Sequence, residues 1–212
     1  MEDVKEKSGT GAKGVKPNIL ICGTPGCGKT STSEAVAEIT GYKHINITDL
    51  VKDKELHDGY DDELDTYIIN EDKVCDELED TLSAGGNIVD THIVDYFPER
   101  WFQLVVVLRC DNTILYERLE KRGYNRRKIE KNVEAEIMQS VRDEAVEAYK
   151  KDIVWEVPSE NIEELESNVK KIVDWVKGYK PTTSSASSKS ASKRAPASNH
   201  AEDDDEEDLS HI

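Results

Sequence analysis

Short apolar runs alternate with amphipathic stretches over the middle of the chain. Each run has the length and content of a β-strand, and several are apolar at consecutive positions. Consecutive rather than alternating apolar residues are typical of strands covered on both faces, as in a parallel sheet. The pattern therefore predicts five parallel strands, over residues 18–23, 42–47, 87–92, 102–110 and 152–158.

The stretches between these runs have the period of an α-helix. The expected helices are residues 29–40, 69–86, 112–123 and 132–150, and a last helix after residue 161. Gly41 should end the first helix, and the Asn161 side chain should cap the last one while Glu164 reaches back. The side chains expected to face inward are Val74, Leu78, Leu82, Val133, Ile137, Val141, Ala145, Ile162, Leu165, Val169, Ile172 and Val176.

Strands that alternate with helices indicate a doubly wound α/β domain. A chain of 212 residues is long enough for one such domain and short for two. We place the domain at residues 17–180, after a polar, glycine-rich lead at residues 1–16 that we expect to be flexible. Residues 181–212 have almost no large apolar side chain, so burial cannot offset their ordering entropy and we expect disorder.

Composition narrows the class of partner. The net charge is −17, with 45 Asp and Glu against 28 Lys and Arg. Such a chain suits a basic protein partner, and we expect no sequence-specific nucleic-acid binding. No apolar stretch approaches the roughly 20 residues needed to cross a bilayer, so no membrane association is expected. The four cysteines have neither zinc-site nor disulfide spacing, which favours a reducing compartment inside the cell.

A phosphate-binding motif follows the first predicted strand. Residues 23–30, GTPGCGKT, match G-x-x-x-x-G-K-[ST] between a strand and a helix, as a P-loop requires. Its glycines let backbone N–H groups approach phosphate oxygens, its lysine adds a charge, and its threonine can ligate Mg²⁺. The predicted nucleotide-binding residues are Gly26, Cys27, Gly28, Lys29, Thr30 and Ser31.

A second acidic group for the metal should stand at the end of an apolar strand. Asp90 in the segment NIVDTH meets this condition, and we expect it to hold Mg²⁺ together with Thr30, Asp90 acting through water. His92 would lie on the same side of an extended segment and could position a water or a phosphate. The alternatives are a turn or capping role for Asp90 and a purely structural role for His92.

Arginines gather downstream in a segment that could cover the site. Arg118 and Arg122 stand one helical turn apart before a glycine-containing loop, with Arg126 and Arg127 just beyond. Phosphoryl transfer needs positive charge around the transferred group, so we predict Arg118 and Arg122, with Lys29, Asp90 and His92, as catalytic. The alternative is a solvated basic patch.

Several motifs in the same order resemble one family. The P-loop, TDLVKD, HDGYDDELDTY, VDTH, DYFPERWF and LYERLEKRGYN make residues 17–179 similar to adenylate kinase isoenzyme 6, the coilin-interacting nuclear ATPase (Fap7-like) family. The resemblance implies a P-loop NTPase of the nucleoside monophosphate kinase fold, with a five-stranded parallel sheet. It also implies a short nucleotide-monophosphate arm at about residues 46–69 and a short lid at about residues 121–131.

The resemblance also implies roles for particular residues. Asp90 would be the acid at the strand end, His92 the second half of the family's D-x-H signature, and Arg122 a contact to ATP. Asp49 and Lys52 would belong to the AMP-binding arm. Conventional adenylate kinases present an arginine where this chain has Lys52, and lysine cannot form the planar bidentate pair with a phosphate.

The activity implied is ATP + AMP ⇌ 2 ADP with Mg²⁺, together with ATP hydrolysis during maturation of the small ribosomal subunit. The implied partners are pre-40S particles and a basic ribosomal protein of the S11/S14 type. A nuclear and cytoplasmic location and a monomeric state are expected. Two alternatives stay open: an ATPase assembly chaperone with incidental AMP kinase activity, and a kinase for another small acceptor, because related folds phosphorylate shikimate or gluconate.

Overall fold

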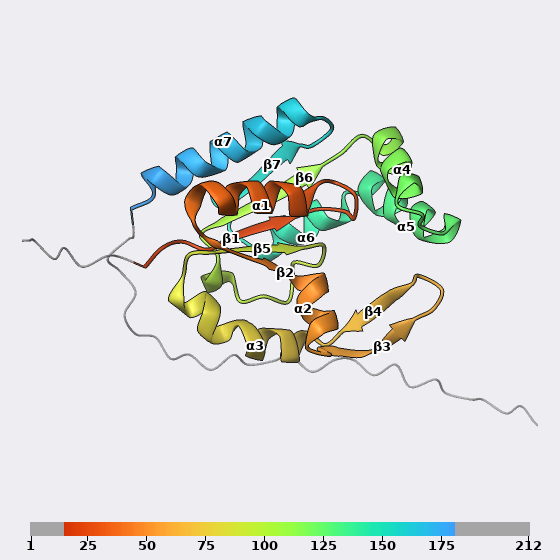
Figure 1. Cartoon of the computed structure of the whole chain (residues 1–212), viewed down its shortest axis with the longest axis horizontal. Coiled ribbons are helices and arrows are strands. Elements are labelled where there is room, and N and C mark those ends of the chain that lie inside the picture. The colour runs from red at the N-terminus through yellow and green to blue at the C-terminus, as the bar shows by residue number, and fades with distance from the viewer. Residues whose placement is uncertain (1–14, 181–212) are drawn as a thin grey trace, which may run out of the picture. The chain divides into compact units, whose positions relative to one another are not determined.

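Five parallel strands form the central sheet of the computed structural model, which describes residues 15–180 (Figure 1). The strand order β2-β5-β1-β6-β7 confirms the predicted five-stranded parallel sheet. The strands are β1 (Ile19–Cys22), β2 (Lys43–Asn46), β5 (Asn87–Thr91), β6 (Leu104–Arg109) and β7 (Val154–Pro158). The predictions for residues 1–14 and 181–212 lie outside the described residues.

Helices cover both faces of the sheet, and the side chains of β1 alternate between two apolar cores. Ile19 and Ile21 pack with α1 (Lys29–Thr40), α4 (Asn112–Lys121) and α7 (Ile162–Gly178). Leu20 and Cys22 belong to the other core, with α2 (Ile47–Asp53), α3 (Glu71–Ala84) and α6 (Ser140–Ala148). All four side chains of β1 are fully buried, which explains the continuous apolar run.

The register brings the carboxyl ends of the central strands together. Cys22 of β1 lies beside Thr91 of β5 and Val107 of β6. The segments that follow these strands therefore meet at one edge of the sheet, where ligands bind in open α/β folds. A short 3₁₀ helix, η1 (Glu99–Trp101), precedes β6.

The predicted capping residues are found at two helix ends. Gly41 ends α1 in the left-handed conformation, as expected. Asn161 Oδ1 accepts a hydrogen bond from Glu164 N (2.8 Å), which confirms the predicted cap of α7. The Glu164 carboxylate accepts from Glu160 N (2.7 Å), one residue earlier than a regular capping box requires.

The single helix predicted over residues 132–150 is wrong. Two helices, α5 (Arg126–Ile137) and α6, meet at Gln139, whose φ is +59°. The periodicity that placed Ile137 inward does not continue across the break, and its side chain is 57 % exposed. Ile162 was also expected inward but stands at the first position of α7, where the helix projects it into solvent at 72 % exposure.

A hairpin that the pattern did not predict occupies the segment assigned to the arm. After α2, strands β3 (His57–Asp61) and β4 (Thr66–Ile69) pair antiparallel and stand apart from the main sheet (Figure 1). No helix within residues 15–180 is long and apolar enough to span a membrane.

The break at Gln139 gives a test of the fold. Because glycine adopts a φ near +60° without steric cost, Gln139→Gly should raise the free energy of unfolding by about 0.5–1 kcal/mol. Gln139→Val should lower it, because a β-branched residue is strained there. Urea denaturation of both variants checks this, and a stabilising valine would argue against the helix break.

Candidate functional site

The phosphate loop is held in its shape by glycines between β1 and α1. Gly23 has a φ of +146°, and a Cβ there would lie 2.5 Å from the Leu108 carbonyl oxygen. Gly26 has a φ of +101°, and a Cβ would lie 2.7 Å from Leu115 Cδ1. Gly28 caps α1, so the loop opens on the positive end of that helix. This cradle matches the one that nucleotide phosphates require.

Lys29 and the two hydroxyl residues after it stand at the start of α1. Lys29 Nζ donates to the Thr24 carbonyl oxygen (3.3 Å), which holds the ammonium over the loop. Burial lowers the pKa of Lys29, the charge of Asp90 opposes this shift, and Arg122 adds to it. Thr30 and Ser31 are exposed at the first turn of the helix.

Three segments of the chain bring polar groups together around Asp90. Thr30 Oγ1 donates to Asp90 Oδ2 (2.7 Å), so the two predicted Mg²⁺ ligands are in contact. Asn46 Nδ2 donates to the same carboxylate oxygen (3.0 Å) and to Thr30 Oγ1 (3.3 Å). Asn46 Oδ1 accepts from Asp49 N as the cap of α2, and this contact fixes the orientation of the amide.

Asp90 is 2 % exposed and ionised. Burial on its own raises the pKa of this carboxyl, but contacts with His44 and Thr30 and the charge of Lys29 outweigh it, so the pKa lies below its ordinary value. His44 Nε2 lies 3.6 Å from Asp90 Oδ2. The carboxylate therefore carries a negative charge at neutral pH, as a metal-binding oxygen must.

His92 lines a cavity of about 370 Å³ beside the phosphate loop, with Thr24 and Pro25. Its side chain makes no hydrogen bond or ion pair within residues 15–180. Burial and the nearby charge of Lys29 lower its pKa to about 4, so the imidazole is neutral at pH 7. A neutral ring could orient a water or phosphate, and the catalytic role stays a prediction.

Arg118 is occupied by the protein itself. Its guanidinium donates to the carbonyl oxygens of Gly26 (3.3 Å), Ser159 (2.8 Å) and Glu160 (2.6 Å). These bonds join the phosphate loop to the segment between β7 and α7. The contacts show a positioning role for Arg118, and its catalytic role stays a prediction.

The segment assigned to the lid is a short turn followed by the first half of α5. Arg122 ends α4 with its side chain exposed and, within residues 15–180, without a hydrogen bond or ion pair. It lies close enough to Lys29 to lower the pKa of that lysine. Of the two predicted arginines, Arg122 is therefore the one available to a nucleotide.

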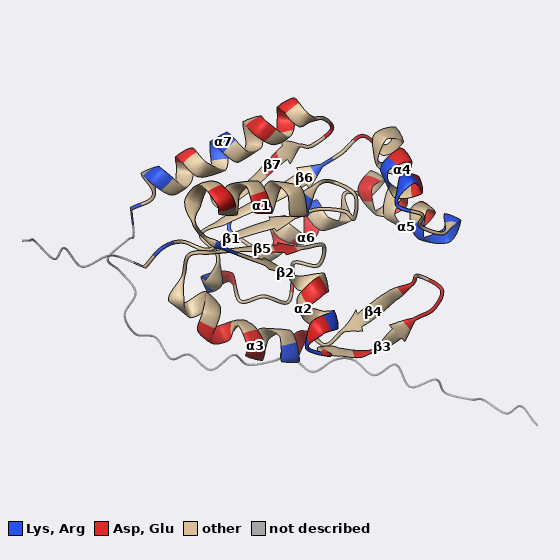
Figure 2. Ribbon diagram, in the orientation of Figure 1, with Lys and Arg blue, Asp and Glu red and all other residues tan. Residues whose placement is uncertain are grey.

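The lid segment contacts the tip of the hairpin. Arg127 forms an ion pair with Glu63, and Lys128 Nζ donates to the Asp65 carbonyl oxygen (2.6 Å). Asn125 Nδ2 donates to the Glu63 carbonyl oxygen (3.3 Å). Figure 2 shows the charge pattern behind these contacts, with basic residues at the α4–α5 junction and acidic residues at the hairpin turn. Arm and lid thus meet across the site.

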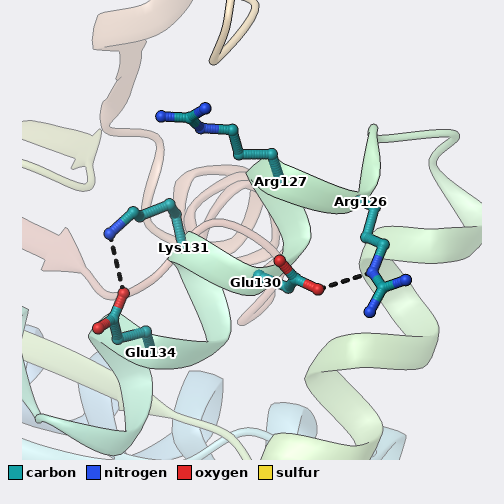
Figure 3. A pocket seen from close by; sticks show the side chains of 5 residues that line it. All are labelled: Arg126, Arg127, Glu130, Lys131 and Glu134. Atoms are coloured by element: carbon teal, nitrogen blue, oxygen red, sulfur yellow. Dashed lines mark hydrogen bonds and ion pairs between the residues drawn. The ribbon is translucent and has the colours of Figure 1, made fainter.

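A second hollow, of about 570 Å³, runs along the outer side of α5 (Figure 3). Its charged groups are already paired, Arg126 with Glu130 (2.7 Å) and Lys131 with Glu134 (3.0 Å), while Arg127 points away from both pairs. The side chains of these two pairs are more than half exposed. This hollow is larger than the cavity at His92, but it offers no buried polar group to a ligand.

The two residues predicted for the AMP arm lie on α2. Asp49 and Lys52 are both exposed, and neither side chain has a hydrogen bond or ion pair within residues 15–180. Among the described residues both are therefore free at the surface of this part of the arm, and their role in binding AMP stays a prediction.

Sequence reasoning missed two polar contacts of the site. Asn46 was noticed only as the start of the arm, although it stands beside Asp90 in the register of β2 and β5. A correct strand order would have found it. Glu136, whose carboxylate accepts a hydrogen bond from the Thr24 hydroxyl, had no motif to mark it.

The residues present fit a nucleotide with Mg²⁺. The glycine cradle would be filled by any Cβ, and the metal side offers a hydroxyl and a carboxylate, the oxygen ligands that Mg²⁺ prefers. Within the described residues no cluster of three His, Cys, Asp or Glu side chains could hold a metal alone. Such a sparse donor set is usual for Mg²⁺, which takes most of its remaining ligands from phosphates and water.

The sheet, the phosphate loop and Asp90 define a P-loop protein of the kinase type. A family model described as "AAA domain" matches residues 19–139. Two solved structures share the fold at low identity. Shikimate kinase from Acinetobacter baumannii in complex with shikimate has a TM-score of 0.54 and 16% identity over 77% of this chain and 94% of that one. Shikimate kinase from Bacteroides thetaiotaomicron has a TM-score of 0.52 and 14% identity, covering 76% and 98%.

Curated relatives are much more similar in sequence. "Adenylate kinase isoenzyme 6 homolog" of Dictyostelium discoideum is 54% identical over 164 residues, which cover 77% of this chain and 94% of the relative. "Adenylate kinase isoenzyme 6 homolog FAP7" of Saccharomyces cerevisiae is 51% identical over 162 residues, covering 76% and 82%. The chain belongs to the adenylate kinase isoenzyme 6 family, which confirms the resemblance found in the motifs.

The neutral state of His92 gives a pH-dependent prediction. The unfolded chain takes up a proton at His92 near pH 6.5 and the folded chain only near pH 4, so its contribution to stability is complete above pH 6.5 and is lost toward pH 4. The loss is at most about 3 kcal/mol. Between pH 7 and 4.5, without nucleotide or Mg²⁺, wild type should lose more unfolding free energy than His92→Gln. Parallel profiles from urea titrations would contradict this prediction.

Proposed function

We propose that the chain is an ATP-dependent kinase that transfers a phosphoryl group to AMP, giving two ADP, and that also hydrolyses ATP. The observation that carries the proposal is the meeting of Lys29, Thr30 and Asp90 at the carboxyl edge of β1 and β5. The glycine cradle before α1 supports it further, as does Arg122, whose side chain has no hydrogen bond or ion pair within residues 15–180 and whose charge acts on Lys29.

The reaction forms a bond between an AMP phosphate oxygen and the γ-phosphorus of ATP and breaks the bond to the bridging β–γ oxygen. Mg²⁺, when bound by Thr30 and through water by Asp90, would neutralise charge on the β- and γ-phosphates. Lys29 and the loop N–H groups hold the same phosphates, and Arg122 supplies charge to the transferred group. In hydrolysis a water replaces AMP as the attacking group.

His92 acts in the hydrolytic branch by orientation. With a pKa of about 4 its ring is too weak a base to carry much of the proton transfer at pH 7. It lines the cavity beside the loop, where a ring nitrogen can hold a water in line with the γ-phosphate.

A second candidate is favoured by the charge of that cavity. Glu71, Asp95 and Glu144 are among its lining residues, and no lysine or arginine is. Burial and the charge of Asp95 raise the pKa of Glu144, as expected where carboxylates face each other. The positive charge that binds the phosphate of an acceptor must therefore come from the arm or the lid, from Lys52 or Arg122. This favours a binding-coupled ATPase, an assembly chaperone whose AMP kinase activity is incidental.

The cellular role proposed is maturation of the small ribosomal subunit, in the nucleus and the cytoplasm. The net charge of −17 supports a basic partner, such as a small-subunit ribosomal protein of the S11/S14 type on pre-40S particles, because an acidic surface can replace the RNA that such a protein binds. The chain would act as a monomer.

Consumption of ATP measured with AMP, with a basic ribosomal protein, and with neither separates the two candidates. Stimulation by AMP, with two ADP formed for each AMP consumed, supports the kinase. Stimulation by the protein, with ADP and inorganic phosphate as products, supports the ATPase.

Lys29→Ala is the matched control for this experiment. Loss of the ammonium over the phosphates should lower turnover at least about 100-fold under all three conditions. The melting temperature of the variant should stay close to that of wild type, because the Lys29 side chain makes a single hydrogen bond within residues 15–180. Turnover at the wild-type rate would overturn the assignment of the phosphate site.

A further inference from the structure

A buried carboxylate on α5 contacts the phosphate loop from behind. Glu136 is 3 % exposed, and its Oε2 accepts a hydrogen bond from the hydroxyl of Thr24, which is 1 % exposed. Its Oε1 accepts from Arg109 Nε (2.6 Å) and from Cys110 N (3.2 Å). The carboxylate therefore joins the loop to the end of β6.

Thr24 connects this carboxylate to the phosphate-binding lysine. Its carbonyl oxygen accepts from Lys29 Nζ (3.3 Å) and from Cys27 N (3.1 Å), the bond that closes the turn of the loop. Glu136 thus holds the side chain of a residue whose backbone holds Lys29. The two contacts form a continuous path from α5 to the ammonium group.

Arg109 anchors Glu136 at the far end of this path. A buried carboxylate is costly unless its oxygens are paired and hydrogen-bonded, and Arg109 provides the opposite charge. Arg109 also pairs with Glu156 (2.9 Å) and donates to the Glu136 carbonyl oxygen (3.1 Å), so it cannot easily follow a displaced carboxylate. The Thr24 hydroxyl is thus bonded to the carboxylate of a residue that also accepts hydrogen bonds from Arg109 Nε, from Cys110 N and, at its own backbone carbonyl, from Arg109.

We propose that Glu136 is a positioning residue for the phosphate site, acting through Thr24 on the turn of the loop and on Lys29. The inference rests on the proposed binding of ATP at this loop. Because α5 begins in the lid, the helix that contacts the arm through Arg127 and Lys128 is also the helix that shapes the phosphate loop.

A matched pair of substitutions at Thr24 tests the hydrogen bond alone. Thr24→Val keeps the branched shape and removes the hydroxyl, while Thr24→Ser keeps the hydroxyl and removes a methyl group. We expect Thr24→Val to lower kcat/KM for ATP about 10- to 100-fold, as loss of a group supporting a site residue does. Thr24→Ser should stay within about 3-fold of wild type.

A double-mutant cycle tests whether Thr24 acts through its contact with Glu136. Glu136→Gln keeps the shape of the side chain and removes its charge. Like Thr24→Val, it should lower kcat/KM for ATP. If both residues act through one contact, the double variant Thr24→Val/Glu136→Gln should have a kcat/KM within about 3-fold of that of the more severe single variant. Multiplication of the two single effects would overturn the proposed path.

Asn18→Ala separates positioning from general stability. Asn18 is buried at the opposite edge of the sheet, where its Nδ2 donates to the carbonyl oxygens of Leu82 (2.7 Å) and Trp101 (3.0 Å). This variant should melt at a lower temperature and keep the wild-type kcat/KM at 25 °C. A loss of kcat/KM equal to that of Thr24→Val would show that destabilisation alone explains both, and would overturn the proposal.

Calorimetry of MgATP binding tests the role of Glu136 independently of the proposed reaction, because it needs no turnover. If wild type binds MgATP but turns it over with neither AMP nor a protein, the proposed function fails. The affinity for MgATP still tests the proposal for Glu136. Thr24→Val should bind MgATP about 10-fold more weakly than wild type, and Thr24→Ser should bind it as tightly as wild type. Equal affinity and equal kcat/KM of Thr24→Val and wild type would overturn it.

Discussion

The buried charge of Asp90 is the constraint on which the site depends. An ionised carboxylate that is 2 % exposed needs partners inside the protein, because burial removes most of its contact with solvent. The strand order supplies them: β2 lies beside β5 and brings Asn46, while β1 leads into the loop that brings Lys29 and Thr30. Thr30 and Lys29, which help His44 to keep Asp90 ionised, are also groups that a nucleotide with Mg²⁺ would contact, so the fold and the site share these two residues.

The lid and the arm are joined by exposed contacts, in contrast to the buried contacts around Asp90. Their contacts lie at the surface, and the side chains of Arg127 and Glu63 are each more than half exposed. Exposed ion pairs contribute about 0–1 kcal/mol and are weakened by salt. Such surface contacts between the lid and the arm cost little to break. At the other end of α5, Glu136 is fixed to β6 by its ion pair with Arg109 and to the phosphate loop by the hydrogen bond from Thr24. The first turn of α5 is therefore held weakly, and its last turn is held firmly.

The sequence was sufficient for the features that depend on local patterns. The sheet, the phosphate loop and Asp90 were predictable because apolar periodicity and glycine spacing are local signals. The break at Gln139 was not, because no glycine or proline marks it and tertiary packing imposes the left-handed residue. The roles of Asn46 and Glu136 required knowing which strands are neighbours and where α5 crosses the loop. Both facts follow from the whole fold and not from any single segment.

The central place of β1 has a consequence for how the protein is made. This strand leaves the ribosome well before both of its neighbours, β5 and β6, which are encoded far downstream. Pairings between such distant segments form late. The phosphate loop is complete as a sequence long before Asp90 and Arg118 exist to hold it, so a nascent chain cannot bind nucleotide tightly. A nucleotide that binds only the folded state can stabilise only a domain in which these strands have paired, so nucleotide binding would report that the domain has folded.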